Sequence, residues 1–154
     1  MLDRLTDLHP DKKRESSSQQ VLNQKQFKEA VIRDLGWLLN AVSMDSVVDL
    51  SAYPEVSHSV LNYGLPDISG HTAASIDTSI LEKSLQRAIS EFEPRFIQNS
   101  LKVKVHADAN EMSHNSLVFE IEGVVFGQPM PFQVVLRSEL DLECGQFNVR
   151  EDTG

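Results

Sequence analysis

The spacing of hydrophobic residues along the chain changes once, near residue 94. Before this point they recur every three or four positions, which is typical of helices with one buried face. After it they alternate with polar residues, which is typical of strands with one buried face. Helices followed by consecutive strands predict an α+β fold, with the N-terminal helices packed on one face of a small antiparallel β-meander.

The first long helix is predicted at residues 24–42. Its hydrophobic stripe consists of Phe27, Val31, Leu35, Leu38, Leu39 and Val42. Trp37 lies roughly 140° from the centre of this stripe, at about 100° of rotation per residue. Trp37 is therefore a candidate anchor for a partner, or it packs under the N-terminal segment of the chain itself. Gly36 is unusual inside a helix, and close approach of another backbone is one explanation.

Two further helices are predicted before the strands. A short one at 54–62 begins with a proline, a residue favoured in the first helical turn. A second long helix is predicted at 78–92, where Ser79 and Glu82 have the spacing of a capping box. Pro94 ends this helix because proline donates no backbone hydrogen bond and disfavours helical conformation in the residue before it.

Four strands are predicted from alternation of period two. The hydrophobic positions that define them are Leu101, Val103 and Val105, then Phe119 and Ile121, then Phe132, Val134 and Leu136, and finally Phe147 and Val149. Gly127-Gln128-Pro129 marks the turn before the third strand. Because strands that follow each other closely usually pair as hairpins, we expect an antiparallel sheet in chain order.

The first 24 residues differ from the rest of the chain. Residues 9–25 are polar and too poor in large hydrophobic side chains to bury themselves, so we interpret them as a flexible linker. Leu2, Leu5 and Leu8 have helical spacing, which predicts a short amphipathic piece or a frayed terminus. The expected organisation is an N-terminal segment with its linker at 1–24 and one α+β domain at 25–154.

Composition excludes several classes of function. The chain of 154 residues has a formal net charge of −9, which argues against binding a nucleic-acid backbone. No stretch reaches the roughly 18 to 20 apolar residues that cross a bilayer, so we expect no membrane insertion and a cytoplasmic location. The single cysteine, Cys144, forms no internal disulfide. The five histidines are scattered without the spacing of a metal site, and no cofactor is expected.

Carboxylate pairs were the only candidates for catalysis. Glu120 and Glu122 on one strand would lie about 6.7 Å apart, within the range of inverting glycosidases. Every pair at this spacing on a strand has the same separation, so a solvated sheet face explains them equally well. Glu91 and Glu93 point in different directions on a helix, and phosphate-binding and nucleophile motifs are not found. The sequence gives catalysis no starting point.

Glu93-Pro94-Arg95 is the remaining constellation, at the junction of helices and strands. A rigid proline separates an acid from a base with fixed donor geometry. Arg95 is suited to bind an acidic group of a partner through two hydrogen bonds, with Glu93 orienting it. The alternative is an internal salt bridge that braces the domain.

Six runs of the sequence form a recognisable set: Met1-Leu2-Asp3-Arg4-Leu5, Arg33-Asp34-Leu35, Trp37-Leu38-Leu39-Asn40, Tyr53-Pro54-Glu55-Val56, Ser59-Val60-Leu61-Asn62-Tyr63-Gly64-Leu65-Pro66-Asp67 and Phe92-Glu93-Pro94-Arg95. Taken together, they resemble the TssE family of type VI secretion baseplate subunits, which is similar to a wedge protein of contractile phage tails. They cover nearly the whole chain in the right order. The run that ends at Asp67 and its combination with Glu-Pro-Arg are the most specific parts.

The resemblance implies a non-catalytic subunit that joins TssF and TssG in the baseplate wedge, with TssK as a further candidate partner. It also implies a template on which the TssB and TssC sheath begins to assemble, through strand addition at the sheet edge near Phe147 and Val149. Candidate partner-binding residues are Glu93, Pro94, Arg95, Trp37, Leu2 and Leu5, and the candidate structural loop is Tyr63, Gly64, Leu65, Pro66 and Asp67. The alternatives are a peptidoglycan hydrolase, since phage relatives have been labelled lysozyme-like, and a free-standing protein-binding adaptor.

Overall fold

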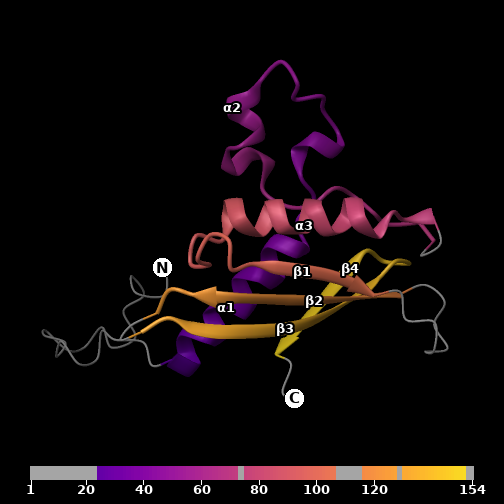
Figure 1. Ribbon diagram of the computed structural model, residues 1–154. Coiled ribbons are helices and arrows are strands. Elements are labelled where there is room, and N and C mark those ends of the chain that lie inside the picture. The colour runs from indigo at the N-terminus through magenta and orange to yellow at the C-terminus, as the bar shows by residue number, and fades with distance from the viewer. Residues whose placement is uncertain (1–23, 73–74, 107–115, 128–129, 152–154) are drawn as a thin grey trace, which may run out of the picture.

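The computed structural model describes residues 24–72, 75–106, 116–127 and 130–151 (Figure 1). Helical elements come first: α1 (Gln24–Leu39), the 3-10 turn η2 (Met44–Ser46), α2 (Pro54–Ser57), the 3-10 turn η3 (Val60–Asn62) and α3 (Thr78–Phe92). Four strands follow: β1 (Lys102–His106), β2 (Ser116–Val125), β3 (Phe132–Asp141) and β4 (Gln146–Glu151). The strands form one antiparallel sheet in the order β1-β2-β3-β4. The predicted fold class and meander are confirmed.

One hydrophobic core lies between the sheet and the two long helices. In register across the strands, Val103 lies opposite Ile121, which lies opposite Leu136, and all three face the core. The largest fully buried side chains are Phe119, Leu35, Leu38, Leu85, Ile89, Leu117, Ile121, Leu136, Leu140, Leu142, Val31 and Val125. Because α1 and α3 contribute to the same cluster, they pack on the same face of the sheet.

The first helix ends three residues earlier than predicted. The Asn40 Nδ2 atom donates to the carbonyl of Gly36 at 2.7 Å, and the chain then turns into an extended segment. Val42 pairs with Leu65 in a parallel bridge and is 58% exposed, so its predicted place on the buried stripe is wrong. Backbone pairing with a distant segment has replaced the last helical turn at this position.

The second long helix has the predicted bounds, but its predicted cap is wrong. Asp77 is the N-cap residue, and its Oδ1 accepts hydrogen bonds from the backbone N–H groups of Ser79 and Ile80 at 2.9 and 3.2 Å. Glu82 instead accepts from the backbone N–H of Val105 at 2.8 Å. The carboxylate therefore ties α3 to β1 and does not close a capping box.

A lobe, defined here as residues 41–66, rises beyond α3 on the side away from the sheet (Figure 1). The helix predicted at 54–62 is broken there into α2 and η3. Ser59 stands at the break, where its Oγ donates to the carbonyl of Val56 at 2.9 Å and accepts from the N–H of Leu61 at 3.2 Å. A side chain that bonds to the local backbone in this way competes with continuous helix.

Candidate partner-binding site

The Glu93-Pro94-Arg95 segment is fixed by its backbone between α3 and the end of β2. Glu93 follows the last residue of α3, and its carbonyl accepts from the N–H of Phe96 at 3.2 Å. The carbonyl of Arg95 accepts from the N–H of Phe126 at 2.7 Å. Pro94 is exposed at the turn, while Glu93 is buried. The proline is thus presented at the surface on a backbone that is held at both sides.

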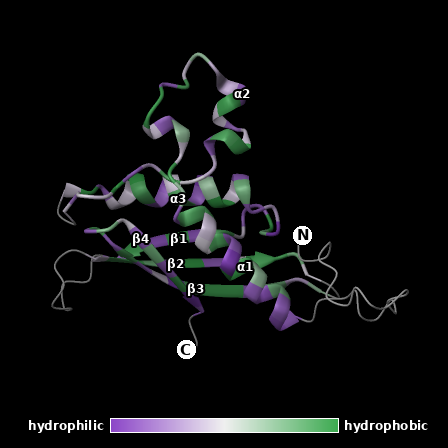
Figure 2. Cartoon of the chain, turned by 180° about the vertical axis from the view of Figure 1, so that it is seen from behind, coloured by the Kyte–Doolittle hydropathy of each residue, from purple (hydrophilic) through white to green (hydrophobic). Residues whose placement is uncertain are grey.

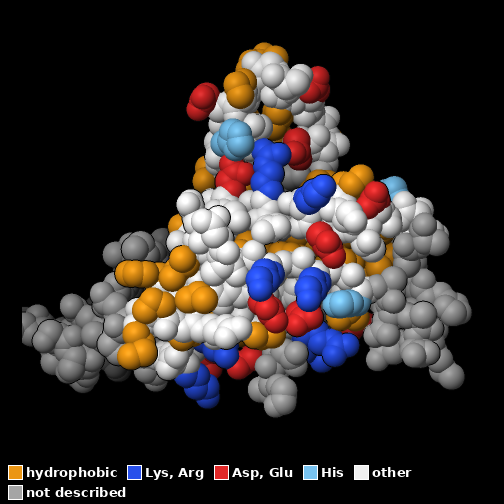
Figure 3. Space-filling model, viewed as in Figure 1, with side chains coloured by type: hydrophobic (Ala, Val, Ile, Leu, Met, Phe, Trp, Pro, Cys, Tyr) orange, Lys and Arg blue, Asp and Glu red, His pale blue; other side chains and the backbone are white. Residues whose placement is uncertain are grey.

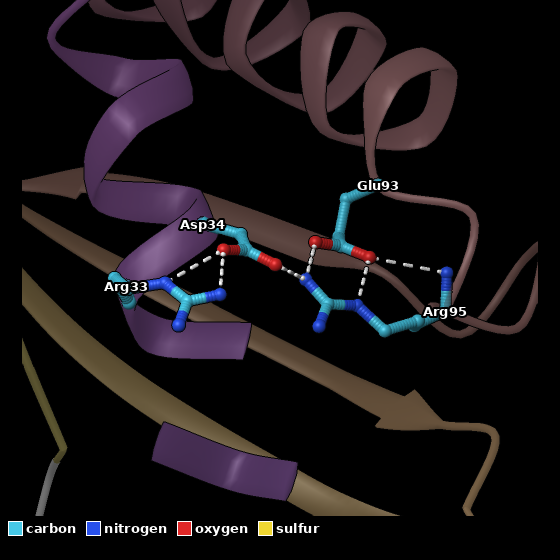
Figure 4. Close-up of polar contacts among 4 residues, drawn as sticks. All are labelled: Arg33, Asp34, Glu93 and Arg95. Carbon is cyan, nitrogen blue, oxygen red and sulfur yellow. Dashed lines mark hydrogen bonds and ion pairs between the residues drawn. The ribbon is translucent and has the colours of Figure 1, made fainter. Parts of the chain in front are cut away.

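Arg95 is the centre of an ion-pair network that joins this segment to α1 (Figure 4). Its Nε donates to Glu93 Oε1 at 2.5 Å and its Nη2 donates to Glu93 Oε2, so the pairing is bidentate. The same Nη2 donates to Asp34 Oδ2 at 2.6 Å. Arg33 donates to the other oxygen of Asp34, through Nε at 3.0 Å and Nη2 at 2.7 Å. Two bases and two acids therefore alternate along the network.

The Glu93–Arg95 pair is largely shielded from water, whereas the side chain of Arg33 at the other end of the network is 41% exposed. The side chain of Glu93 is 5% exposed and that of Arg95 is 14% exposed. Burial by itself would lower the pKa of Arg95, but the hydrogen bonds and charge of Glu93, and then those of Asp34, raise it above its ordinary value. Burial, followed by the charges of Asp34 and Glu93, likewise raises the pKa of Tyr63. The internal salt bridge considered from the sequence is present, and a direct role of Arg95 in partner binding stays a prediction.

The run from Ser59 to Asp67 also packs beside this site, next to the end of α3. The ring of Tyr63 packs edge-on against Phe92 with centroids 5.4 Å apart. Gly64 has a φ of 128°, and a Cβ atom there would lie 2.4 Å from the carbonyl oxygen of Ala41, so no other residue fits. Leu65 is buried and pairs with Ala41 through a 2.9 Å hydrogen bond. This loop packs the lobe onto the end of α1.

Trp37 lies on the side of α1 that faces away from the core and is 59% exposed. The guanidinium of Arg33 stands over its ring, 4.7 Å from the centroid, as in a cation–π pair. A Cβ atom at Gly36 would meet nothing within 4 Å, so close approach within the described chain does not explain this glycine. Leu2 and Leu5 lie outside the described residues, as does the N-terminal segment that was the alternative to a partner over Trp37.

Side chains from the helices reach both edges of the sheet. On β4 the backbone N–H and C=O of Phe147 point away from β3 and bond to the amide of Asn40, at 2.9 Å to Oδ1 and 3.0 Å from Nδ2. On the β1 side, Gln86 donates to the carbonyl of Leu101 at 3.0 Å, and Glu82 accepts from Val105 as described above. Sequence reasoning missed Asn40 as an edge residue because one polar side chain has no periodic signal.

Phe147 and Val149 are candidate partner-binding residues, but their side chains are less exposed than a direct side-chain contact with a partner would require. The Phe147 side chain is 7% exposed and packs against Phe119, with centroids 5.3 Å apart. Val149 is partly buried against the core. In an antiparallel edge strand, alternate residues direct their backbone groups outward, so Val149 and Glu151 present theirs on the same side as Phe147. A partner strand would therefore recognise backbone at this edge, not these side chains.

The carboxylates tested for catalysis lie on the open face of the sheet. Glu120 stands opposite Lys104, and Glu122 stands opposite Lys102. Figure 3 shows basic and acidic side chains side by side over this face. His106 Nε2 also lies 3.6 Å from Glu120 Oε2. These neighbours are those of a solvated, charge-paired surface.

Metal binding and membrane crossing were also considered for the described part of the chain. No group of three or more His, Cys, Asp or Glu side chains is placed there to hold a metal ion. None of the helices in the described ranges has the length and apolar character needed to span a bilayer.

The described residues thus form an α+β domain with a braced surface turn and with backbone groups at both sheet edges bonded by the side chains of Asn40, Glu82 and Gln86. The family model described as "Baseplate wedge protein gp25" matches residues 25–130 of the chain. The chain belongs to this baseplate wedge family, whose members are generally structural components of contractile, tail-like machinery. No curated protein and no solved structure shows significant similarity to it.

Proposed function

We propose that this chain is a TssE-type subunit of a type VI secretion baseplate. It joins TssF and TssG in the wedge, with TssK as a further partner, and it offers a template for the TssB and TssC sheath. It acts in the bacterial cytoplasm and docks through its partners at the inner face of the envelope. The function is structural and non-catalytic, and the net charge of −9 fits protein partners better than nucleic acid.

The observation that carries this proposal is the convergence of the TssE-like runs on one site. Asp34 from the run at 33–35 pairs with Arg95 from the run at 92–95, and Tyr63 from the run at 59–67 packs beside them on Phe92. These residues are separated by up to 61 positions in the sequence. The contact between three of these runs supports the proposal, because residues that are far apart in the sequence and shared with the TssE-like pattern meet at one place in the described chain.

The geometry of Arg95 suits a contact with an acidic or carbonyl group of a partner. Two of its nitrogens are held by Glu93 and Asp34, while Nη1 points away from both carboxylates (Figure 4). Pro94 is exposed beside it. Since the guanidinium is already ordered, a partner acceptor would gain a charge-assisted hydrogen bond without ordering the side chain.

The outer edge of β4 is the proposed template for sheath strands. An incoming strand would add to the outward-facing backbone of Val149 and Glu151, and it would replace the Asn40 amide if it continued to Phe147. On the β1 side two α3 side chains already bond to the edge, at Leu101 and Val105. On β4 both bonds go to Phe147, so the outward-facing backbone of Val149 and Glu151 follows without interruption, whereas the bonded residues on the β1 side lie on both sides of Val103.

The wedge role is tested by co-purification with co-expressed TssF and TssG. We expect the wild-type chain to form a stable complex and Arg95→Ala to lose it. Leu35→Ala is the matched control, because it destabilises the core without altering the surface around Arg95. Both variants are compared at a temperature below their unfolding transitions, which circular dichroism measures. If Arg95→Ala binds as well as wild type, Arg95 does not contact the partner. If the wild-type chain binds neither TssF nor TssG, the alternative of a free-standing adaptor protein is favoured.

The edge role is tested by Val149→Pro, which removes one outward-facing N–H without touching the ladder to β3. We expect wedge formation to continue and sheath extension to fail. Asn148→Pro is the contrasting variant, because its N–H faces β3 and its loss weakens the sheet itself. Normal sheath extension from baseplates that contain Val149→Pro would exclude β4 as the template.

The non-catalytic part of the proposal has its own measurement. Purified chain is incubated with peptidoglycan, and soluble fragments are followed over time. We expect no turnover above buffer. Turnover that disappears in Glu120→Gln or Glu122→Gln would instead establish the hydrolase alternative.

A further inference from the structure

Hydrophobic side chains are concentrated on the outside of the lobe. Among the described residues, seven of the twelve large hydrophobic side chains that are exposed lie between positions 42 and 61: Val42, Met44, Val47, Val48, Tyr53, Val60 and Leu61. The most exposed are Val47 at 81% and Val60 at 80%. Figure 2 shows hydrophobic positions along this outlying part of the chain. Such a concentration marks an interaction surface on a folded protein.

The lobe is held together by polar groups. Asn62 is buried, and its Oδ1 accepts from the N–H of Asp45 at 2.9 Å while its Nδ2 donates to the carbonyl of Ser57 at 3.0 Å. Buried Ser43 bonds through its Oγ to the Asp45 carboxylate. Leu50 is the one buried hydrophobic residue between positions 42 and 61. The polar interior fixes the backbone and leaves the hydrophobic side chains outside.

The two turns that carry the most exposed residues are neighbours in space. The hydrogen bond between Asn62 and Asp45 joins η3 to η2, so the turn that carries Val60 and Leu61 lies beside the turn that Val47 and Val48 follow. This arrangement exists before any partner binds, and the side-chain and backbone ordering that binding requires is correspondingly small. The lobe therefore presents a preformed hydrophobic surface.

Apart from His58, whose Nδ1 pairs with Glu91 of α3 at 2.7 Å, the charged side chains of the lobe are acidic. Asp45, Asp49 and Glu55 are exposed, and positions 41–66 contain no Lys or Arg. Two hydrogen bonds from Ser51, first its backbone N–H and then its hydroxyl, lower the pKa of Asp49, so this carboxylate stays ionised at neutral pH. A complementary partner would place hydrophobic side chains on the lobe and Lys or Arg around them.

We propose that the lobe docks another subunit of the same baseplate wedge, through a hydrophobic segment of that subunit flanked by Lys or Arg. The inference rests on the proposed baseplate function and adds a second surface to it. The lobe extends beyond α3, away from the sheet, so it can bind while the edge of β4 remains accessible to a strand (Figure 1). One subunit would then connect a wedge neighbour at the lobe to the sheath at β4.

The test uses the full chain and purified TssF–TssG complex as the probe. The lobe variant Val60→Ser/Leu61→Ser removes two exposed hydrophobic side chains, and Ile80→Ser on α3 is the control, because Ile80 is also exposed at 63%. We expect the lobe variant to bind at least tenfold more weakly and the control to bind as wild type. Neutralising the acids as Asp45→Asn/Asp49→Asn/Glu55→Gln should weaken binding more at low salt than at high salt.

Each other outcome would overturn the inference in a recognisable way. If wild type and the lobe variant bind TssF–TssG equally, the lobe is not a docking surface, while the proposed function stands. If wild type does not bind, the proposed function itself fails. A wild-type dimer in light scattering that becomes monomeric in the lobe variant would assign the surface to a second copy. Faster amide exchange at 44–61 after deletion of residues 1–23 would assign it to the N-terminal segment.

Discussion

The body of the molecule, meaning α1, α3 and the sheet, and the lobe distribute their residues in opposite ways. The body buries its hydrophobic side chains beneath the sheet and carries paired charges on the outer face. The lobe buries Asn62 and Ser43 and exposes Val47, Val60 and Leu61. Burial of hydrophobic surface stabilises the body, while hydrogen bonds from polar side chains give the lobe its shape.

The Arg95 network stands at the border between these regions. It joins α1 to the turn after α3, and Tyr63 at the base of the lobe packs beside it. A buried ion pair of this kind adds little net stability compared with a hydrophobic pair, but losing one member leaves an unpaired charge. The network therefore joins α1 to the turn after α3, next to the place where Tyr63 at the base of the lobe packs on Phe92.

The largest effect is expected in the body from Leu35→Ala. Leu35 is fully buried in the core, so its truncation should lower the free energy of unfolding by about 3 to 5 kcal/mol, as transfer and cavity terms add. Urea denaturation followed by circular dichroism measures the loss. Leu35→Met nearly conserves the volume and should cost less than about 1.5 kcal/mol. A loss from Leu35→Ala below about 1 kcal/mol would contradict the core assigned here.

The next effect is expected at the border from Arg95→Ala. It leaves the buried Glu93 carboxylate without its partner and should cost about 2 to 4 kcal/mol, somewhat less than a fully buried pair because Arg95 remains partly exposed. The same denaturation experiment measures it. Glu93→Gln/Arg95→Met removes both charges and should recover part of the loss. If Arg95→Ala unfolds like wild type, the network is not a structural brace.

Within the lobe the largest effect is expected from its buried polar residue. Asn62→Ala leaves the N–H of Asp45 and the carbonyl of Ser57 without their partners, which should cost about 1 to 3 kcal/mol. Amide hydrogen exchange at η2 and η3 should rise more than exchange in the sheet. Asn62→Asp keeps the acceptor and serves as the matched variant. Unchanged exchange in both variants would show that the lobe is held by other contacts.

The sequence predicted the body better than the lobe, and the reason is periodicity. Alternation at Val103 and Val105 and at Phe119 and Ile121 covers much of each strand, because one face of the sheet is buried. The second long helix likewise has a continuous hydrophobic face. In the lobe, short turns follow each other and give no continuous periodic pattern. The hydrophobic residues Val60 and Leu61 have the spacing of a buried helix face, but they are exposed.

For the candidate site, the sequence indicated the residues of the turn but not the side chains with which they pair. Glu93, Pro94 and Arg95 were recognised, whereas the pairing of Arg95 with Asp34, 61 positions away, depends on the packing of α1 against the sheet. Glu82 shows the same limit: its spacing from Ser79 fits a local cap, but the N–H of Val105 binds it in the folded chain. Single polar side chains choose long-range partners that no local pattern contains.

The smallest effect is expected from Leu61→Ala, which is the direct counterpart of Leu35→Ala. Leu61 is 65% exposed, so truncation leaves no cavity and should change the free energy of unfolding by less than about 0.5 kcal/mol. The same substitution at a buried and at an exposed leucine thus shows how much of the loss of stability is due to burial. The urea midpoints of the two variants measure the difference. A loss above about 1.5 kcal/mol at Leu61 would mean that another part of the chain covers it. The lobe would then be a packed surface, and its hydrophobic residues would no longer require a partner.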